Sequence, residues 1–266
     1  DMNNDLVTDY PSGFTNPNII SVASSNQQDQ LSSWSQFGKL SVDIMAPGEN
    51  IYTAFSDNGY QFSEGTSFAT GYVSGVAALI KARFPDASYA EIKGRIFAGA
   101  KQLDSLDTLL ASQGRINANN SLTADPNPVL VIREINVKDT NNQALEPGET
   151  VELEVVLENV WRDANSVSAT LTSTDPDISI NLATVDYPDM AEPDTDLSTS
   201  NHFASPTVNF NITLDETASI KPEISFTILI NTEDNIIKRD FTITGNQLHN
   251  QLINNTIQRH EQDEIH

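Results

Sequence analysis

A serine stands at the expected start of a helix in the segment GTSFATG, residues 65–71. The glycine before it permits a tight turn and a close approach of substrate. The first turn of a helix offers unpaired N–H groups and the positive end of the helix dipole, and both favour a developing oxyanion. Ser67, with Gly65 and Thr66 in its turn, is therefore a candidate nucleophile. The alternative is an ordinary N-capping residue, which spacing alone favours.

The elements that must position this serine follow from the flanking sequence. Residues 19–23 and 41–45 are predicted to be short buried strands. Residues 65–82 are predicted to form a helix that is packed inside, because small and apolar residues occupy most of its faces.

A second helix is expected soon after the first. Pro85 ends the first helix, and Ser88 is a candidate N-cap because Glu91 follows three residues later. This capping box predicts a helix to about Ala98. Strands that alternate with helices indicate an α/β layered domain.

Composition excludes several classes of function. Acidic residues number 37 against 14 basic ones, and a net charge of −23 argues against nucleic-acid binding. No apolar run approaches the roughly 18 residues that a membrane-spanning helix needs, so we expect no such helix. The chain has no cysteine, which removes disulfides and thiolate chemistry. The sequence starts without Met or an apolar leader, so we expect a fragment or a processed form whose export signal lies outside it.

A domain boundary is predicted at ADPNPV, residues 124–129, where two prolines forbid a continuing helix. Charge changes there as well, since residues 125–245 hold 22 acidic and 6 basic side chains. We expect one domain over residues 1–124, a second over 129–245, and a polar tail or linker over 246–266.

The second domain is expected to be all β. Its sequence alternates apolar and polar residues in several short segments, which is typical of a β-sandwich. These segments are residues 129–137, 150–158, 167–172, 207–214, 223–230 and 236–244. The acid-rich residues 186–196 are predicted to form a long exposed loop.

The serine segment resembles GTSMATP, which surrounds the nucleophile of subtilisin-like serine proteases. Other segments resemble that family in its order and approximate spacing: YPS (10–12), NIISVA (18–23), LSSWSQFG (31–38) and VDIMAPG (42–48). The resemblance covers roughly residues 1–122 and implies part of a three-layer α/β fold with a mostly parallel sheet. It implies a secreted or cell-surface serine endopeptidase that acts on proteins or peptides. Ser67 would form the acyl-enzyme, its own N–H would lie in the oxyanion hole, and no cofactor would be required.

This sequence departs from the family pattern near the serine. Phe68 stands where the family usually has Met, and Gly71-Tyr72 stands where it usually has Pro-His. The family's Asp and His precede the serine, yet no histidine precedes Ser67. The four histidines are expected on the surface of the second domain or tail: His202, His249, His260 and His266. We therefore expect an incomplete piece that needs a missing N-terminal catalytic segment.

Further site residues come from the resemblance alone. The family's oxyanion-hole Asn is expected upstream of this sequence, and Asn3 and Asn4 are weak alternatives. Asp43 resembles an aspartate that joins the carbonyl groups of Pro17 and Ile19 to bind calcium as a structural ion, and the alternative is a turn-capping aspartate.

Asp9 falls near the family's specificity pocket, where a carboxylate could favour Lys or Arg in the substrate. The alternative for Asp9 is an exposed loop acid.

The second domain has a resemblance of its own. LEPGETVEL (145–153) and LEN (157–159) resemble immunoglobulin-like modules of exported bacterial proteins. Such modules bind, space or anchor, and residues 139–142 are a candidate calcium loop or a solvated turn. A second hypothesis is therefore a non-catalytic subtilase-like scaffold whose acidic sandwich binds a partner or surface.

Overall fold

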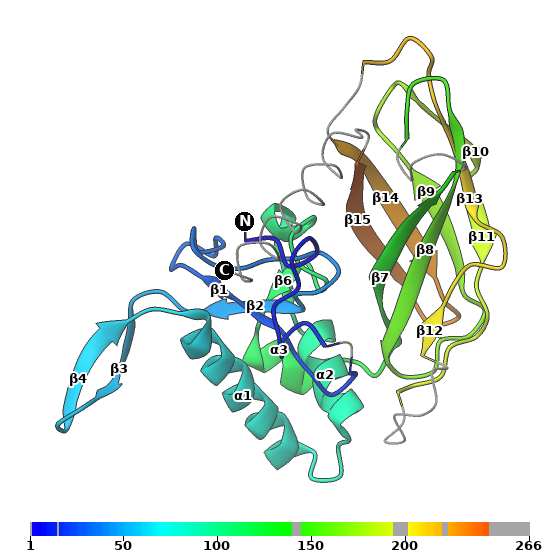
Figure 1. Ribbon diagram of the computed structural model, residues 1–266. Helices are drawn as coiled ribbons and strands as arrows, with labels where there is room; N and C mark the ends of the chain where they lie inside the picture. Colours follow the sequence, from blue (N-terminus) through cyan, green and yellow to red (C-terminus); the bar gives the residue numbers. More distant parts are fainter. Residues whose placement is uncertain (1, 15, 140–144, 194–201, 220–222, 245–266) are drawn as a thin grey trace, which may run out of the picture.

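The computed structural model describes residues 2–14, 16–139, 145–193, 202–219 and 223–244, and the predicted tail lies outside them (Figure 1). The described chain has an α/β part followed by an all-β part. The elements of the α/β part are β1 (Val22–Ser25), β2 (Ile44–Pro47), β3 (Ile51–Phe55), β4 (Gly59–Ser63), α1 (Thr66–Arg83), α2 (Tyr89–Ala98), β5 (Lys101–Gln102), the 3₁₀ turn η1 (Asp104–Leu106), β6 (Gly114–Arg115) and α3 (Ala118–Thr123).

The central sheet of the α/β part has the strand order β1-β2-β6-β5, in which β1, β2 and β6 are parallel and β5 is antiparallel. Side chains of a strand alternate between the two faces of a sheet. Ile44 and Ala46 accordingly face a core shared with α1 and α2, whereas Met45 joins Leu106 and Leu110 on the other face. Among the described residues no α-helix covers that second face, so the predicted third layer is not complete.

The predicted helices are confirmed within one residue at each end. The Ser88 Oγ accepts a hydrogen bond of 3.0 Å from the Glu91 N–H, as the capping box requires. The strands β1 and β2 begin three residues later than expected. The hairpin of β3 and β4, which projects from the side of the molecule away from the all-β part (Figure 1), was not foreseen.

Helix α1 is buried on one side only, so the expectation that it is packed inside is wrong for the described chain. Its buried residues are Ala69, Val73, Val76 and Ile80, which form a single stripe toward the sheet. The rest of the helix surface is exposed, and beside the buried stripe Tyr72 is 47% exposed and Leu79 is 51% exposed. No described element lies over this exposed side, which we call the open face of α1.

The all-β part folds as two antiparallel sheets. Its strands are β7 (Val129–Lys138), β8 (Thr150–Trp161), β9 (Ser168–Thr172), β10 (Ile178–Leu182), β11 (Thr184–Asp186), β12 (Phe203–Ala204), β13 (Phe210–Leu214), β14 (Glu223–Asn231) and β15 (Ile236–Thr244). One sheet holds β7, β8, β10, β12 and β13, and the other holds β9, β11, β14 and β15. Apolar residues of both sheets share one core. The immunoglobulin-like relationship stays a prediction.

The two parts share a hydrophobic core. Trp161, at the end of β8, is fully buried and belongs to the same cluster as Ile44 and Ile96 of the α/β part. Its indole lies against Gly94 of α2, where a methyl group would come within 2.1 Å of the Trp161 Cβ. The Arg95 guanidinium lies 5.1 Å from the centre of the same ring. The two predicted domains therefore pack against each other through a common core.

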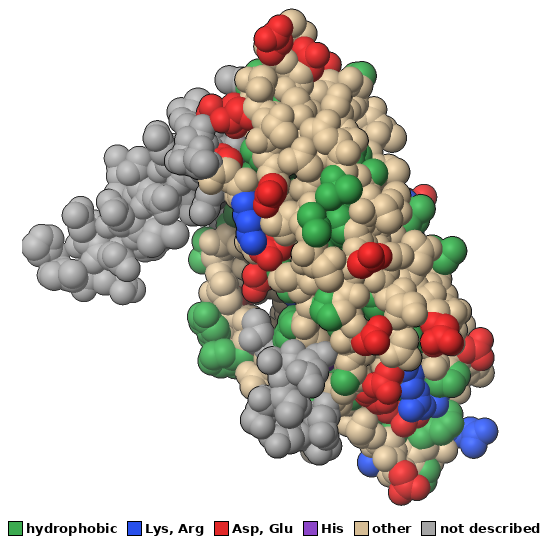
Figure 2. All heavy atoms as spheres, turned by 90° about the vertical axis from the view of Figure 1, so that its right-hand side faces the viewer, with side chains coloured by type: hydrophobic (Ala, Val, Ile, Leu, Met, Phe, Trp, Pro, Cys, Tyr) green, Lys and Arg blue, Asp and Glu red, His purple; other side chains and the backbone are tan. Residues whose placement is uncertain are grey.

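The surface of the all-β part is strongly acidic. Figure 2 shows acidic side chains spread over its face and few basic ones among them, in keeping with the sequence. Within the described residues, no helix is long and apolar enough to cross a membrane.

Candidate active site

The turn before Ser67 is held by two glycines. Gly65 has φ 148°, a conformation that glycine tolerates far better than other residues. Its N–H donates a hydrogen bond of 2.9 Å to the carbonyl oxygen of Gly48, and a methyl group at Gly48 would come within 2.8 Å of the Gly65 oxygen. The close approach of these two backbones sets where α1 begins.

Ser67 is the second residue of α1 and is exposed to solvent. Since α1 begins at Thr66, the first amide groups of the helix have no acceptor one turn earlier. The first turn contains no acidic side chain that would neutralise the positive end of the helix dipole. The local structure therefore suits stabilisation of an oxyanion that develops on a carbonyl group attacked by the Ser67 hydroxyl.

A cavity of about 380 Å³ lies beside this turn, and four of the candidate residues line it, one of which is Ile19. Thr66 lines it, together with Asp9 and Asn4 from the N-terminal segment. Asp9 itself is exposed, whereas Asn4 is buried and its N–H donates to the carbonyl of Phe37. Asn3 forms an isolated β-bridge with Phe37. The lining of the cavity thus includes one carboxylate, that of Asp9, and Thr66 brings the cavity next to Ser67.

No described residue supplies a general base to Ser67. His202 lies beside β8 in the all-β part, where its ring packs 4.5 Å from that of Phe203. It is 7% exposed, so the expectation that it lies on the surface is wrong. The other three histidines lie outside the described residues.

Two of the three predicted calcium ligands are in contact with side-chain cations instead. The Lys93 Nζ donates to the Ile19 carbonyl oxygen at 2.8 Å and lies 3.7 Å from the Asp43 carboxylate. Asp43 also accepts a hydrogen bond from the guanidinium of Arg133. Pro17, the third predicted ligand, lies in the turn before Ile19. The expected set does not fit a metal ion, and in the described chain no three His, Cys, Asp or Glu side chains converge on one point.

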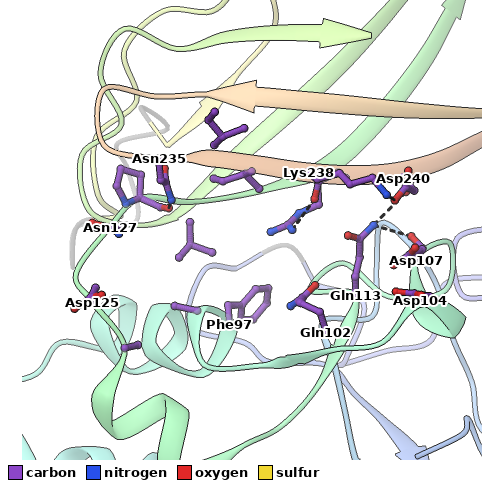
Figure 3. Close-up of a pocket in the computed structure, with 17 residues that line it drawn as sticks. Phe97, Gln102, Asp104, Asp107, Gln113, Asp125, Asn127, Asn235, Lys238 and Asp240 are labelled. Carbon is purple, nitrogen blue, oxygen red and sulfur yellow. Dashed lines mark hydrogen bonds and ion pairs between the residues drawn. The ribbon is translucent and has the colours of Figure 1, made fainter. Parts of the chain in front are cut away.

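A second cavity, of about 530 Å³, lies between the two parts and contains none of the predicted site residues (Figure 3). Its lining mixes the carboxylates of Asp104 and Asp107 with the ammonium of Lys238. Across one end of it, the Gln113 side chain donates to the carbonyl of Asp107 at 2.8 Å and faces the carbonyl of Asp240 at 3.4 Å. These contacts connect the two parts and do not form a reactive group.

Comparison with known proteins shows what the α/β part is similar to. Residues 1–122 match the model of the subtilase family. The chain is 38% identical over 109 residues to thermitase of Thermoactinomyces vulgaris, which covers 41% of this chain and 37% of that protein. It is 37% identical over 143 residues to mycosin-1 of Mycobacterium tuberculosis, which covers 50% of this chain and 32% of the relative.

A solved structure is also similar. The crystal structure of MycP1 without its N-terminal propeptide has 35% sequence identity and a TM-score of 0.37, and the match covers 44% of this chain and 39% of that one. In sequence, the α/β part is thus similar to the subtilase family. The chain spans 26% to 39% of the length of the bacterial relatives that it matches.

Proposed function

We propose that this protein is a secreted or cell-surface serine endopeptidase of the subtilisin type when it is complete. The observation that carries the proposal is the exposed Ser67 at the start of α1, in a segment that matches the subtilase family. Its substrates would be proteins or peptides, and the carboxylate of Asp9 at the neighbouring cavity would favour Lys or Arg before the scissile bond.

The chemistry assigned to the described residues is limited. The Ser67 hydroxyl would attack the scissile carbonyl to form an acyl-enzyme, and amide groups at the start of α1 would stabilise the oxyanion. A serine hydroxyl is a poor nucleophile without a base, and none lies beside it in the described chain. The 266-residue chain alone is therefore expected to be inactive.

We propose that an N-terminal catalytic segment supplies the aspartate and histidine, either from upstream coding sequence or as a separate chain. The open face of α1 supports this proposal. Gly71 and Gly75 lie on it with no atom within 4 Å of an added methyl group, so another element could approach the helix closely. The aromatic rings of the β3–β4 hairpin are exposed as well: Tyr52, Phe55, Tyr60 and Phe62. Surfaces this apolar mark sites of protein contact.

The test is a turnover assay on the completed protein with peptides that carry Lys, Arg or Leu before the cleaved bond. We expect activity in the wild type and a fall to the background rate in Ser67→Ala. Ser74→Ala is the matched control, because Ser74 is also exposed on α1. Activity of Ser67→Ala at the level of Ser74→Ala would refute the proposal.

A second candidate function is a non-catalytic scaffold whose acidic all-β surface binds a partner. The observation in its favour is Gly71-Tyr72, which stands where the family usually has Pro-His, together with the acidic face in Figure 2. Upstream coding sequence separates the two proposals. An in-frame aspartate and histidine of the subtilase type favour the enzyme, and their absence favours the scaffold.

A further inference from the structure

Four charged side chains are buried together where the two parts meet. Asp43 and Lys93 belong to the α/β part, with side-chain exposures of 5% and 6%. Arg133 on β7 and Glu158 on β8 belong to the all-β part, with exposures of 14% and 3%. Burial of a charge is costly unless it is paired and hydrogen-bonded. The two cations and two anions balance, so this cluster has no net charge.

The Asp43 carboxylate is fully used within the cluster. Its Oδ1 accepts a hydrogen bond of 2.9 Å from Arg133, and its Oδ2 accepts one of 2.9 Å from the N–H of Ser21. Burial by itself would raise the pKa of Asp43, but the charges of Lys93 and Arg133 hold that pKa below its ordinary value. The carboxylate is therefore ionised and has cations beside it.

Lys93 contacts two of the three groups that the subtilase resemblance assigned to calcium. Its ammonium donates to the Ile19 carbonyl oxygen at 2.8 Å and lies 3.7 Å from the Asp43 Oδ2. A calcium ion held by the same oxygens, at about 2.3–2.6 Å, would stand beside the ammonium and compete with it for one carboxylate. A divalent ion would also leave the balanced cluster with excess positive charge.

Arg133 reaches this position from the other part of the molecule. Its guanidinium donates to the Leu40 carbonyl oxygen at 2.9 Å, to the Asp43 carboxylate and to the Glu158 carboxylate. Burial would lower the pKa of Arg133, but the two carboxylates raise it above its ordinary value. This one side chain therefore connects the segment just before β2 to the all-β part.

We propose that Lys93 and Arg133 take the place of a structural calcium ion in this protein. Side-chain cations then hold the segment around Ile19 and Ser21 in position. Packing of the all-β part, which supplies Arg133, does for this segment what metal binding would do. Ser21 lines the cavity beside the Ser67 turn, so the cluster supports one wall of the candidate substrate site. The proposal holds whether or not Ser67 is catalytic.

The test measures the melting temperature of the full 266-residue chain by calorimetry in EGTA, in calcium chloride and in magnesium chloride at constant ionic strength. Because the acidic chain responds to any divalent cation by screening, magnesium is the reference. We expect calcium and magnesium to have equal effects on the wild type. Lys93→Met and Arg133→Gln should each melt about 6 °C or more below the wild type in all three solutions.

Lys101→Met is the matched control, because Lys101 also pairs with an aspartate but is 49% exposed. It should melt within about 2 °C of the wild type. If Lys93→Met and Arg133→Gln have the same melting temperature as this control, the proposal is wrong. It is also wrong if calcium raises the melting temperature of the wild type more than magnesium does and Asp43→Asn abolishes that difference.

Discussion

Replacing Gly94 by alanine tests how the two parts are packed together. In an open helix this change stabilises by about 0.5–1 kcal/mol, because alanine has the better helix propensity. At Gly94 the added methyl group would lie 2.1 Å from Cβ and 2.2 Å from Cγ of Trp161. These atoms are close to the backbone and cannot swing away, so the indole or the helix must shift. Overpacking of this kind costs about 1–3 kcal/mol, and steric cost therefore outweighs propensity.

Gly75→Ala on α1 is the matched control, because no atom lies within 4 Å of its added methyl group. We expect urea unfolding of the 266-residue chain, followed by tryptophan fluorescence, to place Gly94→Ala below the wild type in stability and Gly75→Ala above it. If Gly94→Ala is as stable as Gly75→Ala, Trp161 does not pack against α2, and the conclusion that the two parts share a core is wrong.

Three further predictions concern the open face, pH and salt. In the completed protein Gly75→Ala should melt below the wild type, because a second element would then cover α1 and contact the added methyl group. If Gly75→Ala stabilises the completed protein as it does the 266-residue chain, α1 stays open. Burial lowers the pKa of Lys39 to about 7, so between about pH 7 and pH 10.5 the unfolded chain binds more protons than the folded chain. In that window the free energy of unfolding should rise with pH in the wild type and rise less in Lys39→Met. If urea unfolding shows the same pH dependence of this free energy for both proteins, the prediction is wrong. Calorimetry should find a higher melting temperature as sodium chloride screens the net charge of −23, and a flat response would rule out self-repulsion as a limit on stability.

Local signals predicted much of the fold. The capping box placed the start of α2, because a serine N-cap acts through hydrogen bonds within one turn. Alternation of apolar residues placed β15 at residues 236–244, since a strand with one buried face must follow the pleat. The hairpin of β3 and β4 was missed because its aromatic residues are exposed in the described chain and show no buried stripe.

Contacts between distant residues could not be predicted from local patterns. Lys93 and Arg133 meet at Asp43 from 50 and 90 positions away, and nothing near either residue indicates the pairing. Trp161 was likewise placed beyond the end of its predicted strand, yet it fills the space that Gly94 leaves on α2. The start of the helix at the candidate serine was predicted because its turn is encoded by adjacent residues, whereas the contacts of Lys93 and Arg133 with Asp43 depend on tertiary packing.

Ser67 is expected to act as a nucleophile once an N-terminal catalytic segment completes the protein. The most direct measurement treats the 266-residue chain and the completed protein with a fluorophosphonate and locates the adduct by peptide mass spectrometry. We expect an adduct on Ser67 in the completed protein, no adduct on the 266-residue chain alone, and no adduct in Ser67→Ala. An adduct on a different serine, or no adduct in a folded completed protein that carries the upstream aspartate and histidine, would contradict it.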